Sequence, residues 1–226
     1  IEFPAFTPML QLLTATGTAL LVAHTQECEQ AQGDIESMGH YDWRQENIEL
    51  LLECAVLLCE DPWLLYNGTI ESQRNAQKSL STVLGPLFEA FVRCRTRMAA
   101  CEEHHIVSQS TELDQVREEI TDKGLEEEME AGSTIGRLNL SAALSCLSSM
   151  FAATVPRLRT LWDTNGEVTA EASALLEEAR MLTMYVGYLL TDDNQGETPA
   201  IPAAVLAACG ENEHIVGEIF SAVQAL

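Results

Sequence analysis

The chain has 226 residues, of which 46% are hydrophobic, and its 12 lysines and arginines stand against 35 aspartates and glutamates. This apolar content allows a continuous core and excludes a disordered acidic tail. A net charge of −23 disfavours binding to nucleic-acid phosphates or anionic lipid headgroups, because such binding needs lysines and arginines to neutralise the phosphates. The composition therefore predicts no nucleic-acid or membrane partner and favours basic proteins as partners.

Apolar residues recur every three to four positions in the first half of the chain, which is the spacing that lines one face of a helix. This pattern predicts helices from Met9 to Glu29, from Asn47 to Glu60 and from Ser79 to Cys101. We expect the third helix to bend at Gly85-Pro86, and Asp61-Pro62 ends the second, because proline disfavours helix at the residue before it. The second helix is predicted to bury one stripe, made of Leu50, Leu51, Cys54, Leu57 and Leu58.

A run dense in carboxylates, from Glu102 to Glu130, interrupts this rhythm. Residues 102–115 lack apolar periodicity and are predicted to form a loop, and a weak helix follows over residues 125–140. We place the acidic insertion between helices at about residues 102–123 and a second acidic loop at residues 191–201. Three further helices are predicted, namely Asn139–Trp162 with an interruption at Pro156, Glu171–Leu190, and His214–Leu226.

No segment alternates apolar and polar residues as a strand does, so the chain is predicted to be all-α. The helices come in pairs at intervals that match the ~40 to 47 residue period of HEAT or armadillo repeats. Residues 1–226 are therefore interpreted as one array, an α-solenoid of antiparallel helix pairs with about four or five HEAT repeats. A compact helical bundle is the alternative. The chain opens at Ile1 without a methionine, and we expect it to be a fragment of a longer protein.

The cysteines number seven and lie mostly inside apolar helical runs, which favours buried reduced thiols over a disulfide framework. His24 lies on an apolar helix face and is predicted to be a hydrogen-bonded core histidine. The tryptophans are predicted to pack between helix pairs, with partner contact as the minor role; they are Trp43, Trp63 and Trp162.

The clearest enzyme-like pattern is a repeated E-x-x-H, formed by Glu102 with His105 and by Glu211 with His214. Two such motifs with two more carboxylates build di-iron sites in helical bundles, where ligands project from the middle of long helices. Both pairs lie instead at helix ends among polar residues, so solvated charges are the preferred interpretation and a di-iron protein is the minor alternative.

Other patterns for catalysis or metal binding are incomplete. Cys101-x-x-His104 lacks the second ligand pair that a zinc site needs. The sequence contains no nucleophile elbow and no glycine-rich phosphate loop. We therefore predict no enzyme activity and assign no catalytic, cofactor-binding or metal-binding residue.

The second acidic loop lies within YLLTDDNQGETPAIP, from Tyr188 to Pro202, and this stretch closely resembles a segment of the importin-β-like family of nuclear transport receptors. ENIELLLECAVLLCEDPWLL, FEAFVRCR, IGRLNLSAALSCLSSMF and VPRLRTLW look like successive HEAT helices of such a receptor. The similarity runs from about Tyr41 to Cys209, and the QGET loop is its most specific part. The chain departs from the family pattern before Tyr41 and after Cys209.

The resemblance implies a receptor that binds cargo together with Ran in its GTP form, shuttles between nucleus and cytoplasm, contacts nucleoporins and performs no chemistry. It also implies basic cargo, such as a hypusine-bearing translation initiation factor or a Smad-type regulator. The candidate partner-binding residues are Asp192, Asp193 and Glu197 in the loop, and Glu126, Glu127 and Glu130 in the preceding acidic region. A HEAT scaffold outside the transport family is the main alternative.

Overall fold

The computed structural model describes residues 6–60, 69–109, 117–165 and 169–191, together with Pro202, Val205 and Gly217. These residues form α-helices and one short 3-10 helix and contain no strand, which confirms the all-α prediction for this part of the chain. The elements are α1 (Phe6–Gln30), η1 (Ile35–Ser37), α2 (Tyr41–Glu60), α4 (Ile70–Gln109), α5 (Arg117–Arg137), α6 (Leu140–Asn165) and α7 (Ala170–Leu190).

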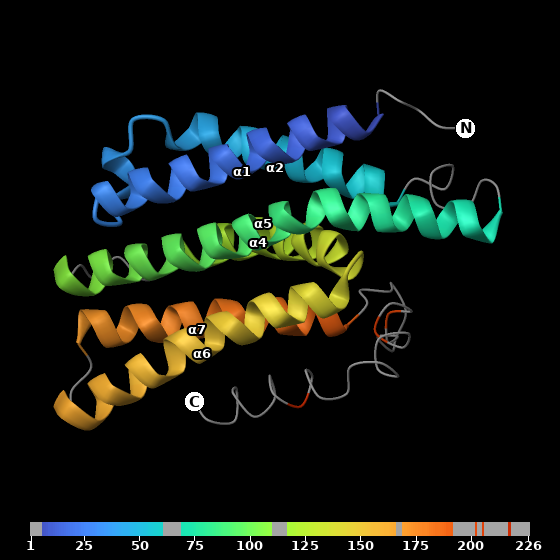
Figure 1. Cartoon of the computed structure of the whole chain (residues 1–226). Coiled ribbons are helices and arrows are strands. Elements are labelled where there is room, and N and C mark those ends of the chain that lie inside the picture. Colours follow the sequence, from blue (N-terminus) through green and yellow to red (C-terminus); the bar gives the residue numbers. More distant parts are fainter. Residues whose placement is uncertain are drawn as a thin grey trace.

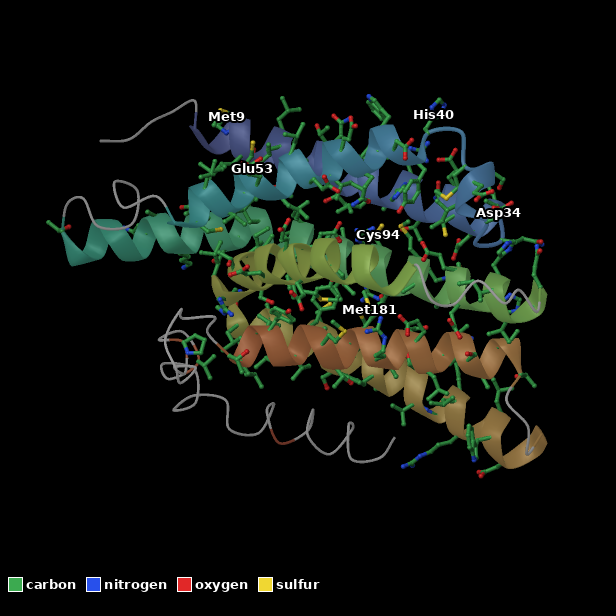
Figure 2. The ribbon with its side chains drawn as sticks, turned by 180° about the vertical axis from the view of Figure 1, so that it is seen from behind. Met9, Asp34, His40, Glu53, Cys94 and Met181 are labelled. Carbon is green, nitrogen blue, oxygen red and sulfur yellow. The ribbon has the colours of Figure 1, made fainter. Side chains whose placement is uncertain are left out.

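The helices lie roughly side by side in three tiers, with α1 and α2 in the first, α4 and α5 in the middle, and α6 and α7 in the last (Figure 1). Helix α4 is the centre of the packing, because its most extensive contacts are with α7 on one side and α1 on the other. Figure 2 shows Cys94 on the α1 side of α4 and Met181 on the α4 side of α7. Helix α2 packs on α5, and α6 packs mainly on α7. One hydrophobic core runs through all three tiers.

Several predicted helix boundaries are wrong, and α5 begins at Arg117 instead of residue 125. Helix α2 begins at Tyr41, before the predicted Asn47, and α4 spans Ile70–Gln109 without a break. The predicted loop at residues 102–115 is therefore wrong for residues 102–109, which continue α4; there Glu103 accepts a hydrogen bond of 2.5 Å from the Ser173 hydroxyl. The predicted helix at residues 214–226 and the predicted loop at residues 191–201 lie almost wholly outside the described residues.

Neither internal proline ends its helix, so the interruption predicted at Pro156 is wrong. Pro86 lies inside α4, and Pro156 lies inside α6. A proline within a helix costs about 3 kcal/mol, whereas each large apolar side chain that the helix buries contributes about 1.5 to 3 kcal/mol. The residues that surround the prolines are buried and offset this cost; they are Leu84, Leu87, Phe88, Val155 and Leu158.

The buried face of α2 is only partly the predicted one, because Leu51 and Leu58 of the predicted stripe are half-buried against the core. Its inward residues are Ile48, Leu52, Ala55 and Cys59, whereas Leu50 and Leu57 are 59% and 63% exposed. The later helices follow their predicted stripes more closely, because α6 buries Leu144, Leu147 and Phe151 and α7 buries Leu175, Leu182 and Leu189. Exceptions there are Trp162 and Leu176, which are exposed.

Two glycines let α5 lie against the seam between α4 and α7. A Cβ atom at Gly132 would come within 2.8 Å of the Phe91 ring, and one at Gly136 within 2.8 Å of the Phe88 ring and 2.9 Å of a Leu189 methyl. Phe91 and Tyr185 meet edge to face beneath this helix, with ring centroids 6.0 Å apart. The absence of side chains at Gly132 and Gly136 therefore allows the backbone of α5 to approach the core closely.

We predict that Gly136→Ala destabilises the protein by about 1 to 2 kcal/mol, because the overpacking cost exceeds the gain in helix propensity. Gly124→Ala is the matched control on the same helix, since nothing lies within 4 Å of a Cβ there. This control should leave the free energy of unfolding unchanged or raise it by up to about 1 kcal/mol. Urea denaturation of both variants measures the difference, and equal effects would contradict the close approach of α5.

Candidate functional site: an acidic groove between α2 and α5

A buried ion pair joins α4 to α5. Arg95 donates two hydrogen bonds to the Glu128 carboxylate, one from Nε to Oε2 at 2.5 Å and one from Nη2 to Oε1. The exposed fractions of these two side chains are only 14% and 9%. Gln45 of α2 donates from Nε2 to Glu128 Oε1 at 2.6 Å and accepts from Arg95 Nη1 at 3.2 Å. This cluster therefore links three helices that lie far apart in the sequence.

His24 lies completely buried beside this cluster, with its ring 5.3 Å from that of Tyr41. The prediction of a core histidine is confirmed for its burial, but neither ring nitrogen has a hydrogen-bond partner among the described residues. Burial, followed by the positive charges of Arg95 and Arg44, lowers the pKa of His24 to about 4. His24 is therefore held in its neutral form inside a polar neighbourhood.

A groove with a cavity volume of about 650 Å³ lies between α2 and α5. Among the side chains that the structure describes, its charged lining is entirely acidic, and the carboxylates come from both helices. Among the side chains that the structure describes, only one of these carboxylates has an ion-pair partner, namely Glu128 with Arg95. The groove glutamates are Glu46, Glu49, Glu53, Glu127, Glu128 and Glu130.

An apolar stripe on the outer face of α2 runs beside the groove. Trp43, Leu50 and Leu57 recur every seven residues, which is two helical turns, and they are 59%, 59% and 63% exposed. Leu50 also lines the groove together with Leu52 and Val56. The predicted packing role of Trp43 is wrong within the described chain, because most of its side chain contacts no neighbouring helix. Apolar and acidic surfaces therefore adjoin along one helix; Figure 2 labels Glu53 on it.

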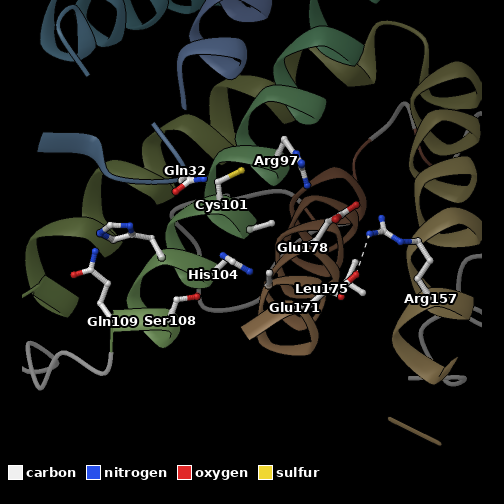
Figure 3. Close-up of a pocket in the computed structure, with 13 residues that line it drawn as sticks. Gln32, Arg97, Cys101, His104, Ser108, Gln109, Arg157, Glu171, Leu175 and Glu178 are labelled. Carbon is white, nitrogen blue, oxygen red and sulfur yellow. Dashed lines mark ion pairs between the residues drawn. The ribbon is translucent and has the colours of Figure 1, made fainter. Parts of the chain in front are cut away.

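A second cavity, of about 470 Å³, lies between the C-terminal half of α4 and the start of α7 (Figure 3). Its lining carries both signs of charge, with Arg97 and Arg157 facing Glu171 and Glu178. Arg97 donates to Glu29 at 2.6 Å, and Arg157 lies 3.9 Å from Glu171. These charges largely compensate one another, so this cavity offers no single-sign field to a charged partner.

The predicted partner-binding residues fall into two groups. Glu127 and Glu130 line the groove, whereas Glu126 is exposed on α5 outside it. Asp192, Asp193 and Glu197 lie outside the described residues. The end of α7, which precedes them, is hydrogen-bonded to α5. Arg137 of α5 donates hydrogen bonds to the carbonyl oxygens of Tyr188, Leu189 and Thr191, at distances of 2.5, 3.3 and 2.6 Å.

Sequence reasoning singled out part of the groove and missed the rest. The α2 glutamates that line it, Glu46, Glu49 and Glu53, were not selected, because the predicted stripe placed the wrong face of this helix inward. A signal was present in the sequence, since Glu46, Glu49 and Glu53 recur every three to four residues, which places them on one face of a helix.

The described residues hold no group of three or more histidine, cysteine, aspartate or glutamate side chains placed to bind one metal ion. Of the two E-x-x-H pairs, Glu102 and His105 lie in the last turns of α4, and Glu211 and His214 fall outside the described chain. No described helix is long and apolar enough to cross a lipid bilayer. Comparisons of the chain with protein-family models, curated proteins and solved structures find no match.

We predict that Arg95→Met destabilises the protein by about 3 to 5 kcal/mol, because it leaves the Glu128 carboxylate buried without its positive partner. Arg93→Met is the matched control, since Arg93 pairs with Glu89 on the exposed face of the same helix. Its cost should stay below about 1 kcal/mol. In chemical denaturation, the double variant Arg95→Met/Glu128→Met should recover most of the lost stability. No recovery would show that the unpaired Glu128 carboxylate does not cause the loss.

We predict that His24 makes the protein less stable as the pH falls from 6.5 to about 4. The unfolded chain binds a proton at this residue below its ordinary pKa of 6.5, whereas the folded chain binds it only below about 4. The free energy of unfolding therefore decreases across this interval, by on the order of 3 kcal/mol. Denaturation of His24→Phe at several pH values should show this slope removed.

The control for this measurement is His40→Phe, because His40 is exposed. This variant should retain the slope that His24 contributes, because His24 is unchanged in it. A His24→Phe profile that retains the same slope would show that His24 titrates normally in the folded protein, contrary to the prediction.

Proposed function

We propose that this chain is a protein-docking module whose groove between α2 and α5 binds a basic, amphipathic segment of a partner protein. The observation that carries the proposal is the lining of the groove, in which the charged side chains that the structure describes are six glutamates. Like charges gathered in a concave surface focus their field and raise the local concentration of ligands of opposite sign. A lysine- or arginine-rich segment relieves this repulsion when it binds.

The apolar stripe specifies the shape of the partner. A helix that lays its apolar face into a groove uses anchor residues at helical spacing, and Trp43, Leu50 and Leu57 offer complementary contacts at that spacing. Basic residues on the flanks of such a helix would meet Glu46, Glu53 and Glu127. The partner is therefore proposed to be helical when bound, with apolar residues on one face and lysine or arginine beside them.

A finer proposal follows from the QGET loop and the helices that resemble the importin-β-like family. We propose that the chain is part of a nuclear transport receptor similar to exportin-4, which binds Ran-GTP and a basic cargo, contacts nucleoporins and shuttles between nucleus and cytoplasm. The strongly acidic surface supports it, because Ran and such cargoes are rich in lysine. A HEAT scaffold outside this family would share the groove but would not respond to the nucleotide on Ran.

The HEAT-solenoid arrangement belongs to the same proposal. In an array of helix pairs, each helix packs on its equivalent in the next pair. Contacts of α1 with α4 and of α2 with α5 follow this rule. The third pair departs from this rule. The equivalent of α4 in that pair is α6, but α4 packs mainly on α7.

We predict that Glu46→Gln/Glu53→Gln/Glu127→Gln weakens binding of a basic amphipathic helical peptide about tenfold at low salt, from losses of roughly 0.5 kcal/mol per rim charge. Fluorescence anisotropy of the labelled peptide measures the affinity. A matched control removes the same charge from exposed residues outside the groove, with Glu36→Gln/Asp163→Asn/Glu171→Gln. An equal loss in both variants would mean that net charge alone attracts the peptide, which would contradict a groove site.

The transport-receptor proposal is tested by a pull-down of Ran. We expect capture of Ran loaded with a GTP analogue and not of Ran loaded with GDP. Capture of neither form by the parent protein, with basic cargo present, would overturn the receptor assignment and leave the docking proposal standing. Loss of GTP-dependent capture in Asp192→Asn/Asp193→Asn/Glu197→Gln but not in the groove variant would assign Ran to the loop and the peptide to the groove.

A further inference from the structure

Two cysteines meet where the end of α1 packs on α4. Cys28 lies near the C-terminus of α1 and is completely buried, and its thiol interacts electrostatically with that of Cys101 on α4. The backbones are also in direct contact there. Gly33 donates its N–H to the Cys28 carbonyl at 3.0 Å, and a Cβ atom at Gly33 would lie 2.0 Å from the Cys101 carbonyl oxygen. The glycine, at φ +81°, therefore allows the two segments to approach closely.

The two thiols differ in accessibility. Cys101 is partly exposed and lines the cavity between α4 and α7, beside Arg97 and Gln32 (Figure 3). Cys28 lies behind it and contributes no surface. A small molecule that enters the cavity can contact Cys101, whereas Cys28 has no exposed surface and does not line the cavity.

The electrostatics of the pair agree with this division. The interaction with the Cys28 thiol, acting against burial and together with the charge of Arg97, lowers the pKa of Cys101 to about 7. The same interaction and burial raise the pKa of Cys28. Cys101 therefore ionises more readily than Cys28, and the thiolate is the form that reacts with oxidants.

We propose that Cys101 is a peroxide-reactive modification site and that Cys28 is its resolving thiol. The Cys101 thiolate attacks one oxygen of hydrogen peroxide, the O–O bond breaks, and hydroxide leaves with a proton as water, which oxidises Cys101 to a sulfenic acid. The Cys28 sulfur then attacks the sulfenic sulfur, the S–O bond breaks, and a second water leaves. Two thiols and one peroxide thus give one disulfide and two waters.

The other described cysteines do not combine these features. Cys54 is exposed, while Cys94 is buried with its sulfur 3.7 Å from the Met98 sulfur. A disulfide between Cys28 and Cys101 would join α1 covalently to the central helix α4, and a thiol reductant would release it. The bond would therefore fix the first tier on the middle tier under oxidising conditions.

Stoichiometric hydrogen peroxide added to the full chain tests the proposal, with intact mass and non-reducing peptide mapping as the readout. We expect a loss of two hydrogens and a peptide that links Cys28 to Cys101, formed before Cys54 is oxidised. The rate should rise with pH around a midpoint near 7, and Cys101→Ala should abolish the linked peptide. The control Cys54→Ala should leave its rate unchanged.

Cys28→Ala should stop the reaction at the sulfenic acid, which a 1,3-dione reagent traps at Cys101. If that buried substitution prevents folding, trapping in the unsubstituted chain within the first seconds reports the same intermediate. Oxidation at Cys54 without a Cys28–Cys101 link would overturn the proposal. A rate of link formation whose pH dependence has its midpoint near the ordinary thiol pKa of 9 would also overturn it, because Cys101 would then react as an ordinary thiol.

Discussion

The bidentate pair between Arg95 and Glu128 is the interaction on which the arrangement of the helices depends. A charged arginine in the core must be neutralised and hydrogen-bonded, because an isolated buried charge costs several kcal/mol. Glu128 of α5 and Gln45 of α2 accept hydrogen bonds from its side chain. The position of α5 over α4, and of α2 beside α5, is therefore specified by polar contacts as well as by apolar packing.

The same pair shapes the groove. Glu128 forms part of the groove lining, and both of its oxygens already accept hydrogen bonds from Arg95 or Gln45. The remaining groove glutamates have no described cation to neutralise them, so their charge is directed at whatever enters. The carboxylates of the groove therefore have different roles: Glu128 stabilises the fold, while its neighbours stay solvated at the surface.

The all-α class and the positions of most helices could be predicted from sequence, because apolar spacing and the absence of strand patterns depend only on neighbouring residues. The inward face of α2 could not. This helix carries two apolar stripes, one through Ile48, Leu52, Ala55 and Cys59 and one through Leu50, Cys54 and Leu57. Periodicity cannot choose between them, and the contact from Gln45 to Glu128, 83 residues away in the chain, is invisible to any local pattern.

The continuation of α4 through its acidic end has a similar cause. Residues 102–109 show no apolar rhythm, yet they extend a helix whose earlier turns are already ordered by the core, and each added residue needs only one more hydrogen bond to propagate it. The contact of Glu103 with Ser173 and the cavity beside Cys101 both exist because α4 extends this far past the core. A tertiary scaffold at one end of a helix thus creates surface features at the other end that no local propensity encodes.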